Sequence, residues 1–137
     1  MARRTECYVD TSALIAFLDR SDSYHAIFRK LFSSPPRLVT SALVIVEGHG
    51  WFLKRYARTR ALQFLSLIED LKPLRLIAVG PDEHAGAVAL LRKFSDQDLS
   101  LTDAVGLHLM KARNIGTCWS TDFHLRLTGV PLAVDRR

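Results

Sequence analysis

Short apolar runs alternate along the chain with longer stretches in which apolar residues recur every three or four positions. The short runs predict buried strands at Cys7–Val9, Leu38–Val39, Leu74–Val79, Thr117–Trp119 and Leu132–Val134. The longer stretches predict amphipathic helices near Ser12–Leu18, Tyr24–Phe32, Ser41–Tyr56, Thr59–Leu71, Asp82–Phe94, Thr102–Arg113 and Asp122–Leu127. Strands that alternate with helices are typical of an α/β fold, in which helices cover both faces of a central parallel sheet.

The chain has 137 residues, the usual size of one domain. Because no repeat or low-complexity linker divides it, we predict a single domain over residues 1–137. No run of about 18 uncharged apolar residues is present, which argues against contact with a membrane through a spanning helix. The first apolar stretch, Cys7–Val9, is too short for a signal-peptide core, so a cytoplasmic location is expected.

Lysine and arginine outnumber aspartate and glutamate by 19 to 14, which gives a net charge of +5. A basic protein favours a polyanionic partner, since each neutralised phosphate of a nucleic acid releases a bound counter-ion. Many basic proteins bind no nucleic acid, however, and the charge alone does not identify the partner.

Two acidic residues follow predicted strands. Asp10 comes directly after Cys7–Val9, and Asp122 comes shortly after Thr117–Trp119. Folds of this class place their binding sites beyond the carboxyl ends of the strands. The two aspartates are far apart in sequence, but the predicted fold would bring them to the same edge of the sheet.

Two further acids lie on predicted helices among apolar neighbours. Leu43 and Trp51 lie one turn before and after Glu47, and Leu107 lies one turn after Asp103. We expect both carboxylates to face the core side of their helices, where an unpaired charge is costly. No lysine or arginine is spaced to neutralise all four acids, whereas a divalent cation could do so.

A cluster of carboxylates suits the hydrolysis of a phosphodiester. The reaction needs a nucleophile derived from water at neutral pH and relief of the negative charge on the phosphoryl oxygens. Oxygen-ligated Mg²⁺ or Mn²⁺ can supply both. We therefore assign catalysis and metal binding, which for Asp103 is direct or through water, to Asp10, Glu47, Asp103 and Asp122.

Each acid also has a purely structural interpretation. Asp10 and Asp122 could cap the helices that follow them, and Asp103 could form a capping box with Ser100. Glu47 is the hardest to explain in this way because it lies inside a helix. The structural interpretation is a serious alternative for any single acid and a weak one for all four together.

Four segments resemble, in order, the motifs of PIN-domain ribonucleases. Tyr8–Leu14 resembles the first motif, an apolar strand ending in Asp and hydroxyl residues, and Val39–Glu47 resembles the second, a Thr-Ser helix start leading to Glu. Ser95–Ala104 is similar to the third motif and Ser120–His124 to the fourth. Each motif is loose, but the ordered set is specific, and it resembles in particular the VapC-type toxins of prokaryotic toxin–antitoxin pairs.

This resemblance implies an α/β/α sandwich with Mg²⁺- or Mn²⁺-dependent endoribonuclease activity. It also implies a homodimer and inhibition by a small cognate VapB-like antitoxin. The acids of the motifs carry over to Asp10, Glu47, Asp103 and Asp122. The motifs also contain supporting residues, expected to orient carboxylates or water, at Thr11, Ser12, Thr40, Ser120 and Asp98. Asp98, like Asp96, could instead belong to a solvated loop.

The densest basic stretch follows the second motif and is interleaved with aromatic residues. Basic and aromatic side chains together can follow a single strand of RNA and stack on its bases. Arg55, Arg58 and His124 are therefore candidate substrate contacts, although a solvated face explains Arg55 and Arg58 equally well. We expect Trp51 and Phe52 to belong to the core or to a dimer interface.

Three other functions compete with a toxin ribonuclease. A phosphohydrolase of the haloacid-dehalogenase type also begins with a strand ending in Asp, but it needs a second Asp where this chain has Ser12. An inactive PIN-like module that only binds RNA or protein would be expected to lack one of the four acids. A housekeeping RNA-processing nuclease shares every motif, so the sequence leaves that function open.

Overall fold

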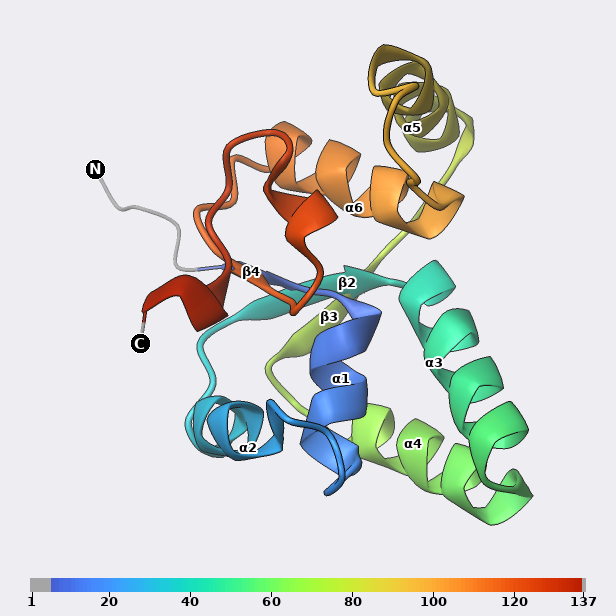
Figure 1. Ribbon diagram of the computed structural model, residues 1–137, viewed down its shortest axis with the longest axis vertical. Helices are drawn as coiled ribbons and strands as arrows, with labels where there is room; N and C mark the ends of the chain where they lie inside the picture. Colours follow the sequence, from blue (N-terminus) through green and yellow to red (C-terminus); the bar gives the residue numbers. More distant parts are fainter. Residues whose placement is uncertain (1–5, 137) are drawn as a thin grey trace.

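Four short parallel strands form the centre of the protein, whose computed structural model describes residues 6–136 (Figure 1). The strands are β1 (Cys7–Val9), β2 (Leu38–Ser41), β3 (Leu74–Ile77) and β4 (Cys118–Trp119). Their order in the sheet is β3-β2-β1-β4, and every pairing is parallel. Because β1 lies between β2 and β4, the residues that follow these strands meet at one end of the sheet.

Helices cover both faces of this sheet. Within residues 6–136 they are α1 (Thr11–Leu18), α2 (His25–Ser33), α3 (Ala42–Arg55), α4 (Arg58–Asp70), α5 (Pro81–Lys93), α6 (Leu101–Ala112) and the short 3-10 helices η1 (Phe123–Arg126) and η2 (Ala133–Arg136). In Figure 1, α5 and α6 lie on one side of the sheet, and α1, α2 and α4 lie on the other. The predicted α/β/α sandwich with a central parallel sheet is confirmed. None of the helices described here has both the length and the hydrophobicity to cross a membrane.

The prediction of a strand at Leu132–Val134 is wrong. Leu132 makes a single bridge to Cys118, and η2 begins at the next residue. The chain turns away from the sheet through two local hydrogen bonds: the Leu132 N–H donates to Oδ2 of Asp135, and the Asp135 N–H donates to the carbonyl of Leu132, both at 3.0 Å. Similarly, the helix expected near Asp122–Leu127 is only the short 3-10 helix η1.

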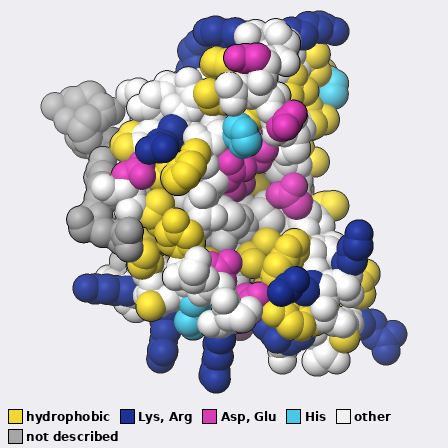
Figure 2. All heavy atoms as spheres, viewed as in Figure 1, with side chains coloured by type: hydrophobic (Ala, Val, Ile, Leu, Met, Phe, Trp, Pro, Cys, Tyr) yellow, Lys and Arg dark blue, Asp and Glu magenta, His cyan; other side chains and the backbone are white. Residues whose placement is uncertain are grey.

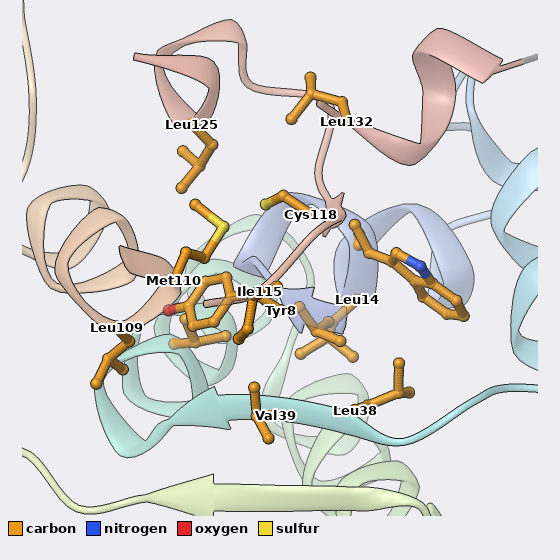
Figure 3. Close-up of a cluster of buried hydrophobic side chains, with 14 of the residues drawn as sticks. Tyr8, Leu14, Leu38, Val39, Leu109, Met110, Ile115, Cys118, Leu125 and Leu132 are labelled. Carbon is orange, nitrogen blue, oxygen red and sulfur yellow. The ribbon is translucent and has the colours of Figure 1, made fainter. Parts of the chain in front are cut away.

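The core is built on the two central strands. Tyr8, Val9, Leu38 and Val39 are completely buried, as expected for a parallel sheet with helices on both faces. Figure 3 shows Tyr8 within this core, close to Met110 of α6. The packed sheet is a rigid base for the residues that follow β1 and β4.

Candidate metal centre

All four acids predicted from the sequence line one cleft of about 380 Å³. Asp10 follows β1, Asp122 follows β4, Glu47 lies on α3, and Asp103 lies in the first turn of α6. On the face shown in Figure 2, acidic side chains gather near the centre, beside a histidine. The fold thus brings together carboxylates from four separate segments, as the strand order requires for Asp10 and Asp122.

Asp10 is the most deeply buried of these acids, with an exposed fraction of 4%. Its Oδ2 accepts hydrogen bonds from the Oγ atoms of Ser12 at 3.0 Å and Ser120 at 2.8 Å. Burial raises the pKa of Asp10 to about 6; the hydrogen bond from Ser120 opposes this rise, and the charge of Asp103 adds to it. At neutral pH, Asp10 therefore carries a charge that its surroundings only partly stabilise.

The two serines connect Asp10 to the loop after β4. Ser120 Oγ accepts a hydrogen bond from the Asp122 backbone N–H at 2.9 Å, and Ser12 Oγ accepts one from the Thr121 N–H at 3.0 Å. Each hydroxyl donates to Asp10 and accepts from this loop. The carboxylate is thereby fixed in one orientation relative to Asp122.

The two motif threonines act at different places. Thr11 Oγ1 donates a hydrogen bond to Oε1 of Glu47, which links the start of α1 to α3. Thr40 is buried on β2 and does not line the cleft; its Oγ1 donates to the carbonyl of Val9 at 2.6 Å. Thr40 thus fixes the backbone immediately before Asp10, whereas Thr11 holds a carboxylate directly.

The prediction that Glu47 faces the core is wrong. The buried face of α3 consists of Val44, Gly48 and Phe52, which lie four residues apart. Glu47 precedes Gly48 and is therefore rotated by about 100° from that face. Its side chain is exposed and reaches the cleft from the rim, where Thr11 holds it.

Asp103 and Asp122 also have the structural roles considered above. Asp103 and Ser100 form a capping box at the start of α6, with hydrogen bonds of 3.0 and 3.2 Å. Asp122 Oδ1 caps η1 by accepting a hydrogen bond from the His124 N–H at 3.0 Å. Asp10 precedes α1, but its side chain makes no capping hydrogen bond. Asp103 and Asp122 therefore both cap a helix and line the cleft.

The same two aspartates lie close enough to share a cation. A carboxylate oxygen of each and a ring nitrogen of His124 all lie within 4.8 Å of one another. His124 Nδ1 lies 2.9 Å from Asp122 Oδ1. Burial raises the pKa of Asp103 and the charge of Asp122 adds to the rise, against the opposing effects of Ser100 and His124. Two neighbouring carboxylates are a suitable place for a positive ion.

This set of donors fits a hard divalent cation. Carboxylate oxygens are the ligands that Mg²⁺ and Mn²⁺ prefer, and all four carboxylates line one cleft. Burial and the charges of neighbouring acids raise the pKa values of Asp10 and Asp103. A bound cation would therefore offset the electrostatic cost of keeping these carboxylates ionised. The residues that could hold it are Asp10, Glu47, Asp103 and Asp122.

The remaining candidate residues lie outside this cleft. Asp98 and Asp96 are exposed between α5 and α6 and do not line it, which agrees with the solvated-loop interpretation. Arg55 ends α3 and Arg58 begins α4; both are exposed. His124 is half-buried beside Asp122 and does not form part of the cleft wall.

Three residues of the cleft wall were not predicted for the site: Ile15, Trp51 and Ser100. Of these, Trp51 is half-buried, although we predicted a place in the core or in a dimer interface. Its neighbour Phe52 is fully buried, as predicted. The useful signal in the sequence is the spacing of four residues between Glu47 and Trp51, which places both side chains on one face of α3.

A comparison with models of known families identifies the fold. The model of the PIN domain matches residues 7–129. The chain belongs to the PIN-domain family. All four acids of the cleft fall within the matched part of this PIN domain. No curated protein sequence matches the chain.

Three solved structures are similar to this PIN domain. VapC20 of Mycobacterium tuberculosis, described as a toxin that cleaves the sarcin–ricin loop, has a TM-score of 0.83 at 22% identity, covering 90% of this chain and 95% of its own. A toxin–antitoxin complex from Klebsiella pneumoniae has a TM-score of 0.62 at 20% identity; the match covers 93% of this chain and 95% of the chain from the complex. VapBC2 of Rickettsia felis, bound to a promoter DNA fragment, has a TM-score of 0.65 at 14% identity; the match covers 93% of this chain and 97% of the other chain. These similarities establish a shared fold.

Proposed function

We propose that this PIN domain is a Mg²⁺- or Mn²⁺-dependent endoribonuclease and the toxin of a type II toxin–antitoxin pair. The observation that carries the proposal is the convergence of Asp10, Glu47, Asp103 and Asp122 on one cleft of a PIN-domain fold. Convergence of four acids from separate segments is costly without a cation, and a cation among carboxylates is what phosphodiester hydrolysis needs.

Each acid has a partner that positions it for this role. Ser12 and Ser120 orient Asp10, and Thr11 orients Glu47. The remaining two acids, Asp103 and Asp122, are held by their capping hydrogen bonds with Ser100 and His124. When bound, the divalent cation supplies a water nucleophile at neutral pH and neutralises charge on the phosphoryl oxygens.

Two observations support RNA as the substrate and a toxin as the biological role. The net charge of +5 favours a polyanion, and a structure with the same fold is described as a toxin that cleaves the sarcin–ricin loop. The other two similar structures are described as a toxin–antitoxin complex and as VapBC2. A cognate VapB-like antitoxin is therefore part of the proposal. We also propose a homodimer, which the resemblance of the motifs implies, and a cytoplasmic location, which the sequence predicts.

The test is cleavage of a panel of defined RNAs with Mg²⁺, with Mn²⁺ and with a chelator. We expect the wild type to cleave with either ion, the chelator to stop cleavage, and Asp10→Asn to reduce kcat by at least about a hundredfold, because loss of a ligand removes stabilisation of several kcal/mol. Asp96→Asn is the matched control, since Asp96 is an exposed acid outside the cleft. Equal rates for the wild type and a folded Asp10→Asn variant would refute the proposal.

The toxin role has a separate test in growing cells. Expression of the chain without a partner should arrest growth, and expression of Asp10→Asn should not. Normal growth in the presence of an active wild-type enzyme would favour the housekeeping RNA-processing nuclease instead. Absence of cleavage with every RNA and both ions would favour the inactive binding module.

A further inference from the structure

A second recess adjoins the acidic cleft. Trp51, Lys54 and Arg55 line a recess of about 380 Å³ on α3. Trp51 also forms part of the wall of the cleft that contains the four acids. The indole therefore separates the acids on one side from two basic side chains on the other.

This arrangement follows from helical spacing. Trp51 comes four residues after Glu47, and Lys54 and Arg55 come seven and eight residues after it. Residues with these separations share one face of a helix. At 1.5 Å per residue, the face extends about 12 Å along the axis from Glu47 to Arg55. A linear polymer could lie along it and contact the acid, the aromatic ring and the basic groups in turn.

The indole is held firmly but remains partly exposed. Its ring packs edge-on against buried Phe52, with centroids 4.9 Å apart and an interplanar angle of 83°. The Tyr56 ring lies 6.1 Å away on another side. The guanidinium of Arg55 lies over the indole, 5.5 Å from its centroid. Guanidinium planes and nucleobases stack on aromatic rings in the same way, so Arg55 marks a place where a base could lie.

The positive charges of the recess are available to a ligand. Lys54 and Arg55 are exposed, and neither lies within salt-bridge distance of a carboxylate among residues 6–136, although the charge of Arg55 acts on Asp19 at longer range. Exposed cations can bind phosphate and release its counter-ions. An aromatic ring flanked by exposed cations is the combination that binds single-stranded nucleic acid.

We propose that Trp51, Lys54 and Arg55 form a nucleotide subsite for single-stranded RNA. A base replaces the Arg55 guanidinium over the Trp51 indole, and the displaced Arg55 side chain and Lys54 bind the phosphate attached to that nucleotide. Given the proposed ribonuclease function, this nucleotide flanks the scissile bond. The subsite would then help to decide which sequences are cleaved, because bases differ in how strongly they stack.

Binding is tested with a short single-stranded oligoribonucleotide in the presence of Mg²⁺ and in the Asp10→Asn background, where the proposed function predicts no cleavage of the ligand. The chain has two tryptophans, and Trp119 is buried, so stacking should quench the emission of Trp51. We expect Trp51→Ala to abolish this quenching and to weaken binding by about 5- to 100-fold. Trp51→Phe keeps an aromatic face and should retain most of the affinity, and Trp51→Leu keeps apolar bulk if the alanine variant does not fold.

The base and phosphate contacts can be separated with an abasic oligomer of the same length. Trp51→Ala should bind this oligomer as well as the wild type does, since no base is left to stack. The double variant Lys54→Gln and Arg55→Gln should bind both oligomers more weakly and with a smaller salt dependence. Arg92→Gln is the matched control, because Arg92 is an exposed cation on α5 that lines neither recess.

Three outcomes decide between the alternatives. Unchanged affinity of Trp51→Ala for the base-containing oligomer would overturn the subsite. Unchanged affinity together with loss of a dimer on light scattering would assign Trp51 to a subunit interface instead. Quenching and the expected loss of affinity, in a chain that cleaves no RNA, would support the subsite and refute the ribonuclease function.

Discussion

Asp10 and Asp19 have similarly small exposed fractions, 4% and 5%, but the Asp10 carboxyl lies much deeper in the protein, and the pKa values of the two shift in opposite directions. Burial opposes ionisation of both side chains. For Asp10, burial together with the charge of Asp103 outweighs the hydrogen bonds, and the pKa rises to about 6. For Asp19, hydrogen bonds from Ser21 and Tyr56 and the charge of Arg55 outweigh the smaller effect of burial, and the pKa falls. The depth of burial and the hydrogen bonds and charges of the neighbours together decide the state of each carboxylate.

The hydrogen bond from Tyr56 to Asp19 should stabilise the protein only while Asp19 is ionised. Tyr56 Oη donates to Asp19 Oδ2 at 3.0 Å. Because the pKa of Asp19 is lower in the folded state, this stabilisation is complete above its ordinary pKa of 3.8 and is lost as the pH falls through the folded value. Tyr56→Phe should lower the free energy of unfolding by about 1 kcal/mol at neutral pH.

Urea unfolding of the wild type and of Tyr56→Phe from about pH 7 to about pH 2.5 checks this prediction. The difference in the free energy of unfolding should be constant down to about pH 4 and then shrink toward zero. A difference of the same size at both ends of the range would show that the phenylalanine acts through packing rather than through Asp19.

The packing of α3 against α4 depends on a glycine. A Cβ atom built at Gly48 would lie 2.3 Å from Cζ of Phe64, which is completely buried. Gly50, on the same helix, has nothing within 4 Å of such an atom. Gly48→Ala should therefore destabilise the protein by about 1–3 kcal/mol through overpacking. Gly50→Ala should stabilise it by up to about 1 kcal/mol through helix propensity.

Thermal unfolding of the two variants and the wild type provides the comparison. The two glycines differ by only two positions in one helix, so their intrinsic preferences largely cancel. An increase in the Tm of Gly48→Ala would mean that α4 moves away without cost and that the contact between α3 and α4 is loose.

At the level of elements, the sequence predicts well those helices and strands that follow from the spacing of apolar residues. The four strands and six α-helices of residues 6–136 arise from apolar spacing that differs clearly between the two kinds of element. The apolar run at Leu132–Val134 fits a strand equally well, but there the chain forms local hydrogen bonds between Leu132 and Asp135 and enters η2. The pattern of polar and apolar residues does not show where such local bonds replace a strand.

The candidate site was predictable to a similar extent. Asp10 and Asp122 could be placed together because strand ends meet at one edge of a parallel sheet. The orientation of Glu47 could not, because Val44, Gly48 and Phe52 form the buried face of α3 and only the packed structure shows which of several apolar stripes is buried. Trp51 was assigned to the core or an interface for the same reason, since a half-buried aromatic and a core aromatic look alike in sequence.

At the scale of the whole molecule, one face has positive charge around an acidic centre. Lysine and arginine side chains lie mostly along the edges of the face shown in Figure 2, and acidic side chains gather near its middle. The net charge of +5 would attract RNA to this face, and a cation in the cleft would offset its local repulsion.

Binding of single-stranded RNA should therefore weaken strongly with salt. Each neutralised phosphate contributes a slope of about −0.7 to the logarithmic salt dependence, so two contacts predict a loss of about sevenfold between 50 and 200 mM monovalent salt. Fluorescence titration at constant Mg²⁺ would measure this loss. Affinity that does not change with salt would show that the basic edges do not contact the phosphates.

The capping hydrogen bonds of Asp103 and Asp122 have an evolutionary consequence. Selection for a stable fold alone would preserve both aspartates, because each closes the start of a helix. Glu47 is exposed inside a helix and caps nothing, so mutations there would accumulate soon after selection for catalysis ended. Among descendants of this protein, decay of activity should thus be visible first at Glu47, while the two capping positions still look intact.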